Sequence, residues 1–294
     1  MKAAILCDSS AYLKHPLKDK ENIFQVDFTL VLPDGEVITE STDENHLDTF
    51  FKTWMTKDTG QPKTSQPNIQ DYHDRYEEII KAGYDTVFGV YLSSGVSGTF
   101  NTAELVSEEY RDRLNIYNLD AVGLSVNMEQ IILQISTMIE QGLEAESIIK
   151  NAQTLMSDSR FFICLETNDN LIKGGRGEAL TQYENQALKT RSVLEYVPET
   201  TPEVRHLLRT NKQVIKTMTD IGKEFRSQHP NQNLLISIGH TLSEEKAKEL
   251  AESLQDALDQ TVDLSIIGTA FCSHLGKGAL SVGFMPTYKE FPHD

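Results

Sequence analysis

The sequence predicts an α/β protein of two domains, in which a parallel β-sheet with helices on both faces forms the first domain. In the first half, short apolar runs alternate with segments whose apolar residues recur at helical spacing. Strands separated by helices of this length form βαβ units, and their strands are parallel. The 294 residues suffice for two domains of roughly 100–200 residues each. We place them at residues 1–158 and 159–294, both α/β.

The first domain is expected to hold strands at residues 3–7, 86–92 and 115–119. Apolar spacing predicts helices at 68–81, 99–110, 125–141 and 144–157. Asn68 is a suitable N-cap for the first of these helices, and Gly83 and Gly142 end two of them. Ligands bind at the carboxyl ends of the strands in such sheets, so the loops there are candidate sites.

The second half is less regular. We expect strands at 160–165, 189–197, 234–239, 262–268 and 280–285, and a turn bracketed by Pro198 and Pro202. Helices are expected at 209–226 and 243–259. Ser243 would be the N-cap of the second helix, with Glu244 and Glu245 in its first turn.

Charge and cysteine content narrow the functional classes. With 27 Lys and Arg against 44 Asp and Glu, the net charge is −17, which makes nucleic acid an unfavourable partner. The three cysteines are far apart and form no metal-ligand spacing, so no metal site is expected. The N-terminus has no signal-peptide pattern, and no apolar segment is long enough to span a membrane. These features predict a cytoplasmic protein.

Two hydroxyl-rich segments precede expected helices. Residues 64–67 (TSQP) lie before the helix at 68, and residues 93–99 (SSGVSGT) connect a buried strand to a helix. Hydroxyls, glycines and free backbone N–H groups at a helix start suit a carboxylate or a phosphate. Taken alone, the first segment is better explained by a simple capping turn, whereas for the second segment a connecting loop is an equal alternative.

Two glycine-rich segments lie in the second half. Residues 273–279 (SHLGKGA) place His274 in an expected loop between two late strands, and residues 173–177 (KGGRG) place Arg176 between glycines. A surface histidine and a helix C-cap are the alternative interpretations. The region from Lys173 to Lys216 carries eight basic and five acidic residues, so it is +3 while the remainder is −20. Such a region favours an acidic group or partner, although ordinary solvated helix faces account for many such charges.

Taken in order, these motifs resemble the DegV family of bacterial proteins. The resemblance runs over nearly the whole chain, through residues 7–10 (CDSS), 64–67, 93–99, Asp120, 173–176, 209–210 (RT) and 273–278. The chain departs from the family pattern at Leu275 and Lys277, at Gly177-Glu178 and at Arg191-Ser192.

The resemblance implies a two-domain DegV-like fold that binds a long-chain fatty acid in a buried tunnel, with the carboxylate in the cleft between the domains. It implies a lipid-carboxylate site made by Thr64, Ser65, Ser94, Ser97 and His274. It also implies a non-catalytic carrier without cofactor or metal, which presents the acid to a separate fatty acid kinase subunit and makes transient membrane contact. Arg176 and Arg209 would meet phosphate or the partner.

Two other functions remain open from the residues. Ser97 lies in a near match to a nucleophile elbow, so a serine hydrolase or esterase using His240 or His274 is one alternative. A regulatory domain that binds a small anion, without a lipid tunnel, is the other.

Overall fold

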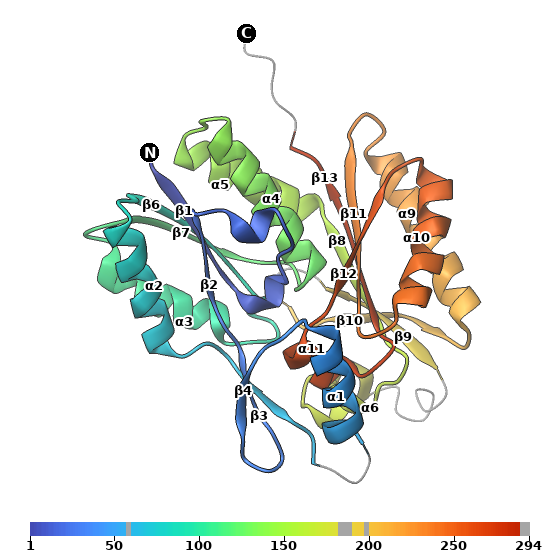
Figure 1. Ribbon diagram of the computed structural model, residues 1–294. Helices are drawn as coiled ribbons and strands as arrows, with labels where there is room; N and C mark the ends of the chain where they lie inside the picture. Colours follow the sequence, from blue (N-terminus) through green and yellow to red (C-terminus); the bar gives the residue numbers. More distant parts are fainter. Residues whose placement is uncertain (57–59, 182–189, 197–199, 289–294) are drawn as a thin grey trace.

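Three β-sheets and the helices around them make up the computed structural model (Figure 1). The structure describes residues 1–56, 60–181, 190–196 and 200–288. The expected termini of one strand, residues 189 and 197, and Pro198 of the expected turn lie outside the described residues.

The first sheet is parallel, with strand order β2-β1-β6-β7. Its strands are β1 (Ala3–Asp8), β2 (Ile23–Val26), β6 (Thr86–Tyr91) and β7 (Asn115–Asp120). The three expected strands are confirmed to within one residue. The short strand β2 was not predicted.

Helices cover both faces of this sheet, as expected. Alternate residues of β1 point to opposite sides: Ala4 and Leu6 pack with α2 (Ile69–Lys81) and α3 (Thr99–Ser107), whereas Ile5 and Cys7 pack with α4 (Val126–Glu140). Helix α5 (Ala145–Asp158) lies against α4. The described residues of this half also include three short 3-10 helices, η1 (Ser9–Ala11), η2 (Leu17–Asp19) and η3 (Glu108–Tyr110).

The second sheet has six strands in the order β10-β9-β8-β13-β11-β12, and only the β11–β12 pair is parallel. The strands are β8 (Arg160–Cys164), β9 (Arg191–Tyr196), β10 (Glu203–Leu208), β11 (Leu234–His240), β12 (Val262–Ile266) and β13 (Leu280–Pro286). Strand β10 was not predicted. Helices α9 (Asn211–Gln228) and α10 (Glu244–Leu258) pack on one face of the sheet.

A small antiparallel sheet, β4-β3-β5, lies against the second half of the chain. Its strands are β3 (Thr29–Val31), β4 (Val37–Thr39) and β5 (Lys63–Ser65), and α1 (Glu44–Trp54) follows β4. The second half also has short helices α6 (Asp169–Lys173), α7 (Glu178–Thr181) and α11 (Thr269–Leu275). The prediction that His274 lies in a loop was therefore wrong, because His274 is in the last turn of α11.

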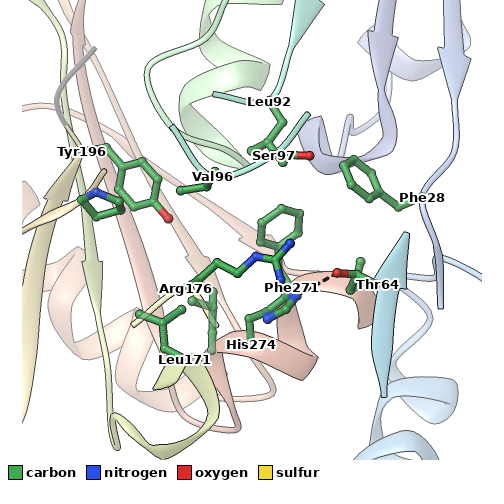
Figure 2. Close-up of a pocket in the computed structure, with 13 residues that line it drawn as sticks. Phe28, Thr64, Leu92, Val96, Ser97, Leu171, Arg176, Tyr196, Phe271 and His274 are labelled. Atoms are coloured by element: carbon green, nitrogen blue, oxygen red, sulfur yellow. Dashed lines mark hydrogen bonds between the residues drawn. The ribbon is translucent and has the colours of Figure 1, made fainter. Parts of the chain in front are cut away.

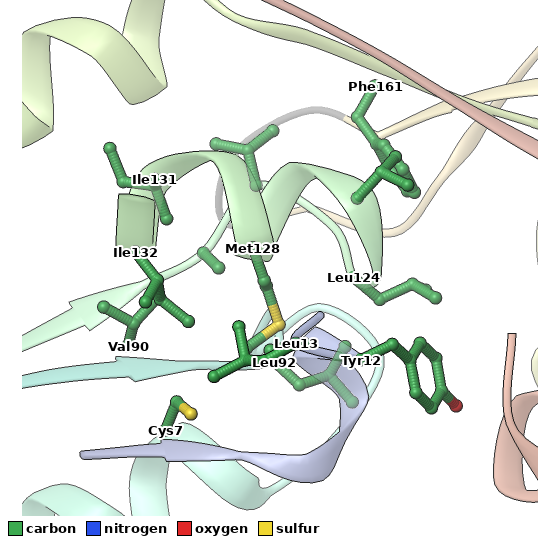
Figure 3. Packing of buried hydrophobic residues seen from close by; sticks show 14 of the residues in the cluster. Cys7, Tyr12, Leu13, Val90, Leu92, Leu124, Met128, Ile131, Ile132 and Phe161 are labelled. Atoms are coloured by element: carbon green, nitrogen blue, oxygen red, sulfur yellow. The ribbon is translucent and has the colours of Figure 1, made fainter. Parts of the chain in front are cut away.

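One continuous apolar core joins the two α/β domains. Figure 3 shows Met128 and Ile132 of α4 on the side of the helix that faces Cys7 of β1 and Val90 of β6, whereas Ile131 points the other way. The same helix also contacts β11 and β13 of the second sheet, and α5 contacts β13. The division at residues 158 and 159 therefore stays a prediction. Of the helices in the described ranges, none combines the length and apolar character needed to cross a bilayer.

The two expected N-caps differ in the structure. The Asn68 side chain accepts a hydrogen bond from the Asp71 N–H at 3.1 Å, and the Asp71 carboxylate accepts one from the Asn68 N–H at 3.2 Å, forming a capping box. Ser243 occupies the N-cap position of α10 but makes no side-chain capping bond.

We predict that Asn68→Ala lowers the free energy of unfolding by about 1 kcal/mol, because it removes the side-chain oxygen that accepts from the Asp71 N–H. Ser243→Ala is the matched control and should change it by only a few tenths of a kcal/mol. Urea unfolding of both variants measures the difference. Equal losses in the two variants would contradict this account of the caps.

Candidate functional site

A cavity between the two α/β domains is the candidate site. It encloses about 540 Å³ of space, part of it open to solvent. Residues from both halves of the chain line it (Figure 2): Phe28, Thr64, Leu92, Val96, Ser97, Leu171, Arg176, Tyr196, Pro202, Ala270, Phe271, His274 and Leu275.

Most of the cavity wall is apolar. The first half contributes Phe28, Leu92 and Val96, and the second half contributes Leu171 and Phe271 among others. Leu92 and Leu171 belong to the apolar core, so the cavity wall is continuous with the interior of the protein. Such a wall favours a hydrocarbon group over a polar one, because burial removes apolar surface from water.

We call three polar side chains of the cavity wall, Thr64, Ser97 and His274, its polar corner, although only Thr64 and His274 are in contact and Ser97 faces them across the cavity. The Thr64 Oγ1 and His274 Nε2 atoms are 2.8 Å apart, within hydrogen-bonding distance, and connect β5 to α11 across the two halves. In Figure 2 the dashed line between these two side chains marks this contact, and the Ser97 hydroxyl lies on the opposite side. The Ser97 hydroxyl is 2.7 Å from the Thr99 hydroxyl at the start of α3.

The His274 ring is held neutral at ordinary pH. Burial, and next the positive charge of Arg176, lower the pKa of His274 to about 4. Its Nδ1 atom is buried and has no hydrogen-bond partner among the described residues. Gly174 packs directly on the ring, since a Cβ at this position would lie 2.4 Å from Nδ1. A side chain at Gly174 would therefore displace the imidazole.

Two of the five residues expected at the carboxylate site do not line the cavity. Ser65 is exposed, because adjacent residues of a strand point to opposite faces and Thr64 faces the cavity. Ser94 lies in the expected loop, but its hydroxyl donates to the carboxylate of Asp120 at the end of β7. The structure thus brings together Thr64, Ser97 and His274, and leaves Ser65 and Ser94 outside.

The two expected arginines differ in position. Arg176 lines the cavity and is exposed, and its guanidinium donates to the Gly174 carbonyl at 2.8 Å. Arg209 is exposed immediately before α9.

The surplus of positive charge in the Lys173–Lys216 region is partly neutralised by ion pairs. Arg191 pairs with Glu166 and Lys216 with Asp220, two acids outside the region, whereas the Arg205–Glu195 pair lies within it and leaves the surplus unchanged. Glu184, Lys189 and Glu199 of this region lie outside the described residues.

The geometry does not assemble a serine nucleophile with a histidine base. Ser97 is hydrogen-bonded to Thr99, and His274 to Thr64. His240 lines a different cleft, where its Nδ1 accepts from the Ser243 N–H at 3.3 Å. A general base must contact the nucleophile it activates, and neither histidine has that contact here. The described residues also contain no cluster of His, Cys, Asp and Glu suited to a metal ion.

Several residues of the cavity wall were not predicted from the sequence. Phe28, Leu171, Tyr196 and Phe271 come from four separate segments, so no local pattern identifies them. Phe28 and Phe271 pack edge to face with ring centroids 6.1 Å apart, which closes one side of the cavity.

The fold and this cavity define a two-domain α/β protein with an apolar cavity between its domains. The family model described as "Uncharacterised protein, DegV family" matches residues 2–287, and the chain belongs to the DegV family.

Individual relatives agree with this assignment. A DegV domain-containing protein of Streptococcus pneumoniae is 29% identical over 287 residues, covering 97% of this chain and 99% of the relative. A structure described as a fatty acid binding DegV family protein from Streptococcus agalactiae is 26% identical, with a TM-score of 0.87, covering 98% of this chain and 100% of that one. A DegV lipid binding protein from Thermotoga maritima is 25% identical, with a TM-score of 0.84 and coverage of 99% and 100%.

We predict that His274 makes the free energy of unfolding of this protein decrease at acid pH. The pKa of His274 is about 4 in the folded protein against 6.5 for an unperturbed histidine, so the unfolded chain binds more protons between these values. The stability from the neutral ring is complete above about pH 6.5 and is lost as the pH falls towards 4. The free energy of unfolding falls between pH 7 and pH 4.5, and in His274→Gln this fall should be smaller than in the parent protein by about 1–2 kcal/mol.

Urea unfolding at the two pH values measures this effect, and NMR titration measures the pKa of His274 directly. His206→Gln, at an exposed position of β10, is the control and should leave the loss unchanged. A His274 that titrates near 6.5 would refute the prediction.

Proposed function

We propose that this protein binds a long-chain fatty acid in the interdomain cavity, with the carboxylate at the polar corner. One observation carries the proposal: a largely apolar cavity ends at two hydroxyls and a neutral imidazole contributed by three separate segments. This combination suits a ligand with a long hydrocarbon part and one small polar group.

The energetics favour such a ligand. Each CH₂ transferred from water to an apolar wall contributes about 0.8 kcal/mol, so the acyl chain supplies most of the affinity. The desolvated carboxylate needs hydrogen-bond donors. The Thr64 and Ser97 hydroxyls can donate to it, and Arg176 at the cavity wall offers a positive charge. When Thr64 donates to the ligand, His274 Nε2–H can donate to Thr64 Oγ1.

The comparisons support this proposal. The relatives from S. agalactiae and T. maritima, described as fatty acid binding and lipid binding, match over essentially the whole chain. Because this chain has the same fold as these relatives and contains a largely apolar cavity, the same class of ligand is the simplest occupant.

We further propose that the protein is a non-catalytic carrier that presents the acid to a separate fatty acid kinase subunit in the cytoplasm. Arg176 borders the cavity and is exposed, so it could contact a phosphate transferred to the carboxylate. Arg209, also exposed, would contact the partner. Transient contact with a membrane would supply or receive the acid.

Binding can be tested with purified protein. We expect mass spectrometry of extracted lipid to find a long-chain fatty acid, and the delipidated protein to bind palmitate or oleate again. Thr64→Ala and Ser97→Ala should each weaken binding roughly tenfold, because each removes a hydrogen bond to a charged group.

Ser65→Ala is the matched control, since Ser65 is adjacent to Thr64 but faces away from the cavity. Its affinity should stay within about twofold of the parent protein. Absence of any acyl ligand, together with stabilisation by phosphate alone, would refute fatty-acid binding.

The carrier role needs a separate test with a fatty acid kinase subunit and ATP. We expect Arg209→Ala to retain fatty-acid affinity but to lower kinase-dependent acyl phosphate formation by about tenfold, as expected for a lost charged contact. Lys216→Ala is the control, because Lys216 is in the same basic region and already pairs with Asp220. Equal rates in both variants would argue against docking at Arg209.

A further inference from the structure

The carboxylate of Glu40 joins the N-terminal segment of the chain to helix α11. Glu40 directly follows β4, and its Oε2 accepts from the Ser9 hydroxyl at 2.7 Å. Its Oε1 accepts from the Tyr12 hydroxyl and from the Ala270 N–H, the latter at 3.2 Å. In Figure 3 the Tyr12 hydroxyl points out of the apolar cluster. Glu40 does not line the cavity, and no sequence motif indicated it.

Ser41 extends the same connection. Its carbonyl accepts from the Thr269 N–H at 3.0 Å, and its own N–H donates to Thr269 Oγ1 at 3.1 Å. With the Glu40–Ala270 bond, three hydrogen bonds attach the first turn of α11 to residues 40 and 41. Gly268 permits this approach, since a Cβ there would lie 2.8 Å from Glu40 Oε1.

Helix α11 carries two walls of the cavity. Phe271 and His274 both line it, and His274 contacts Thr64 of the polar corner. Phe271 also packs edge to face on Tyr12, with ring centroids 6.3 Å apart. The position of the first turn of α11 therefore sets the position of both walls, because the helix spans only residues Thr269–Leu275.

The hydrogen bonds of Glu40 suit the ionised carboxylate, which accepts from all three donors. Burial raises the pKa of Glu40 to about 7, despite these donors. The other ionisable groups facing it are Asp8 of β1, Tyr12 directly after η1, and Cys272 of α11. No lysine or arginine in the described part of the chain pairs with it. The Glu40 part of this attachment thus depends on the charge state of a single side chain, whereas the two Ser41–Thr269 bonds do not.

We propose that Glu40 is a positioning residue of the polar corner: its ionised carboxylate holds α11, and hence His274 and Phe271, in the geometry that binds the ligand carboxylate. The role in ligand binding rests on the proposed fatty-acid function. The attachment of α11 does not, and it can be measured in the ligand-free protein.

Hydrogen–deuterium exchange of α11 in the delipidated full-length protein tests the attachment. Glu40→Ala should make the amides of α11 exchange at least tenfold faster than in the parent, and Glu40→Gln should show a smaller increase because it keeps one acceptor. After correction for intrinsic rates, the parent should protect α11 better at pH 8 than at pH 6. Glu40→Gln should lack this dependence. Glu36→Gln, an exposed acid between β3 and β4, is the control.

Palmitate affinity is measured on the same proteins. We expect Glu40→Ala to bind palmitate roughly tenfold more weakly than the parent protein, and Glu40→Gln to show a smaller loss of affinity. Tyr12→Phe is a milder variant for use should Glu40→Ala not fold.

Three results would overturn the positioning role: unchanged exchange of α11 in the Glu40 variants, a pH dependence that persists in Glu40→Gln, or tighter binding by Glu40→Gln, which would mean that Glu40 merely repels the ligand. If the parent protein binds no fatty acid, the proposed function fails, while the exchange data still decide whether Glu40 holds α11.

Discussion

The burial of α4 between the two main sheets is the packing interaction on which the rest of the structure depends. Ile131, Ile132 and Ile135 of this helix are fully buried, within a core that also includes β1, β6, β8 and β13 residues. A helix apolar on most of its circumference needs partners on both sides, and each sheet supplies one. The cavity lies beside this shared core, so its walls are held by the same packing that joins the domains.

The polar corner is made of electrically neutral side chains. It consists of two hydroxyls and a neutral imidazole, so none of these three side chains brings a permanent positive charge to the cavity. The one arginine of the wall is exposed, where its charge stays hydrated. Close packing of Gly174 on His274 and the Thr64 contact fix the imidazole from two sides. The site therefore relies on shape and preorganised hydrogen bonds more than on charge.

Periodicity predicted the elements that are long and buried on a regular face, such as β1, β6, α2 and α4. It missed the three-residue strands of the small sheet, because three residues carry no measurable period. It also missed α11, because Gly276 and Gly278 directly follow this helix and residues 273–279 together have the composition of a loop. These missed elements place Thr64 and His274, so the sequence could name these residues through family resemblance but could not show that they meet.

Ser65 illustrates a further limit. The motif identifies a pair of hydroxyls, but only the strand register decides which of the two faces inward, and that register depends on pairing with β3. Ser94 likewise depends on Asp120, which is distant in sequence and comes from the neighbouring strand.

The sharing of α4 has a consequence for how an occupant enters and leaves. Proteins with a cleft between domains commonly exchange ligands by hinge bending, which needs a sparse interface and a flexible connection. Here a hinge motion would have to pull α4 off one of its sheets and expose fully buried isoleucines, at a cost of about 2 kcal/mol for each side chain. Opening by a hinge between the two domains is therefore disfavoured, because the shared helix makes them one body.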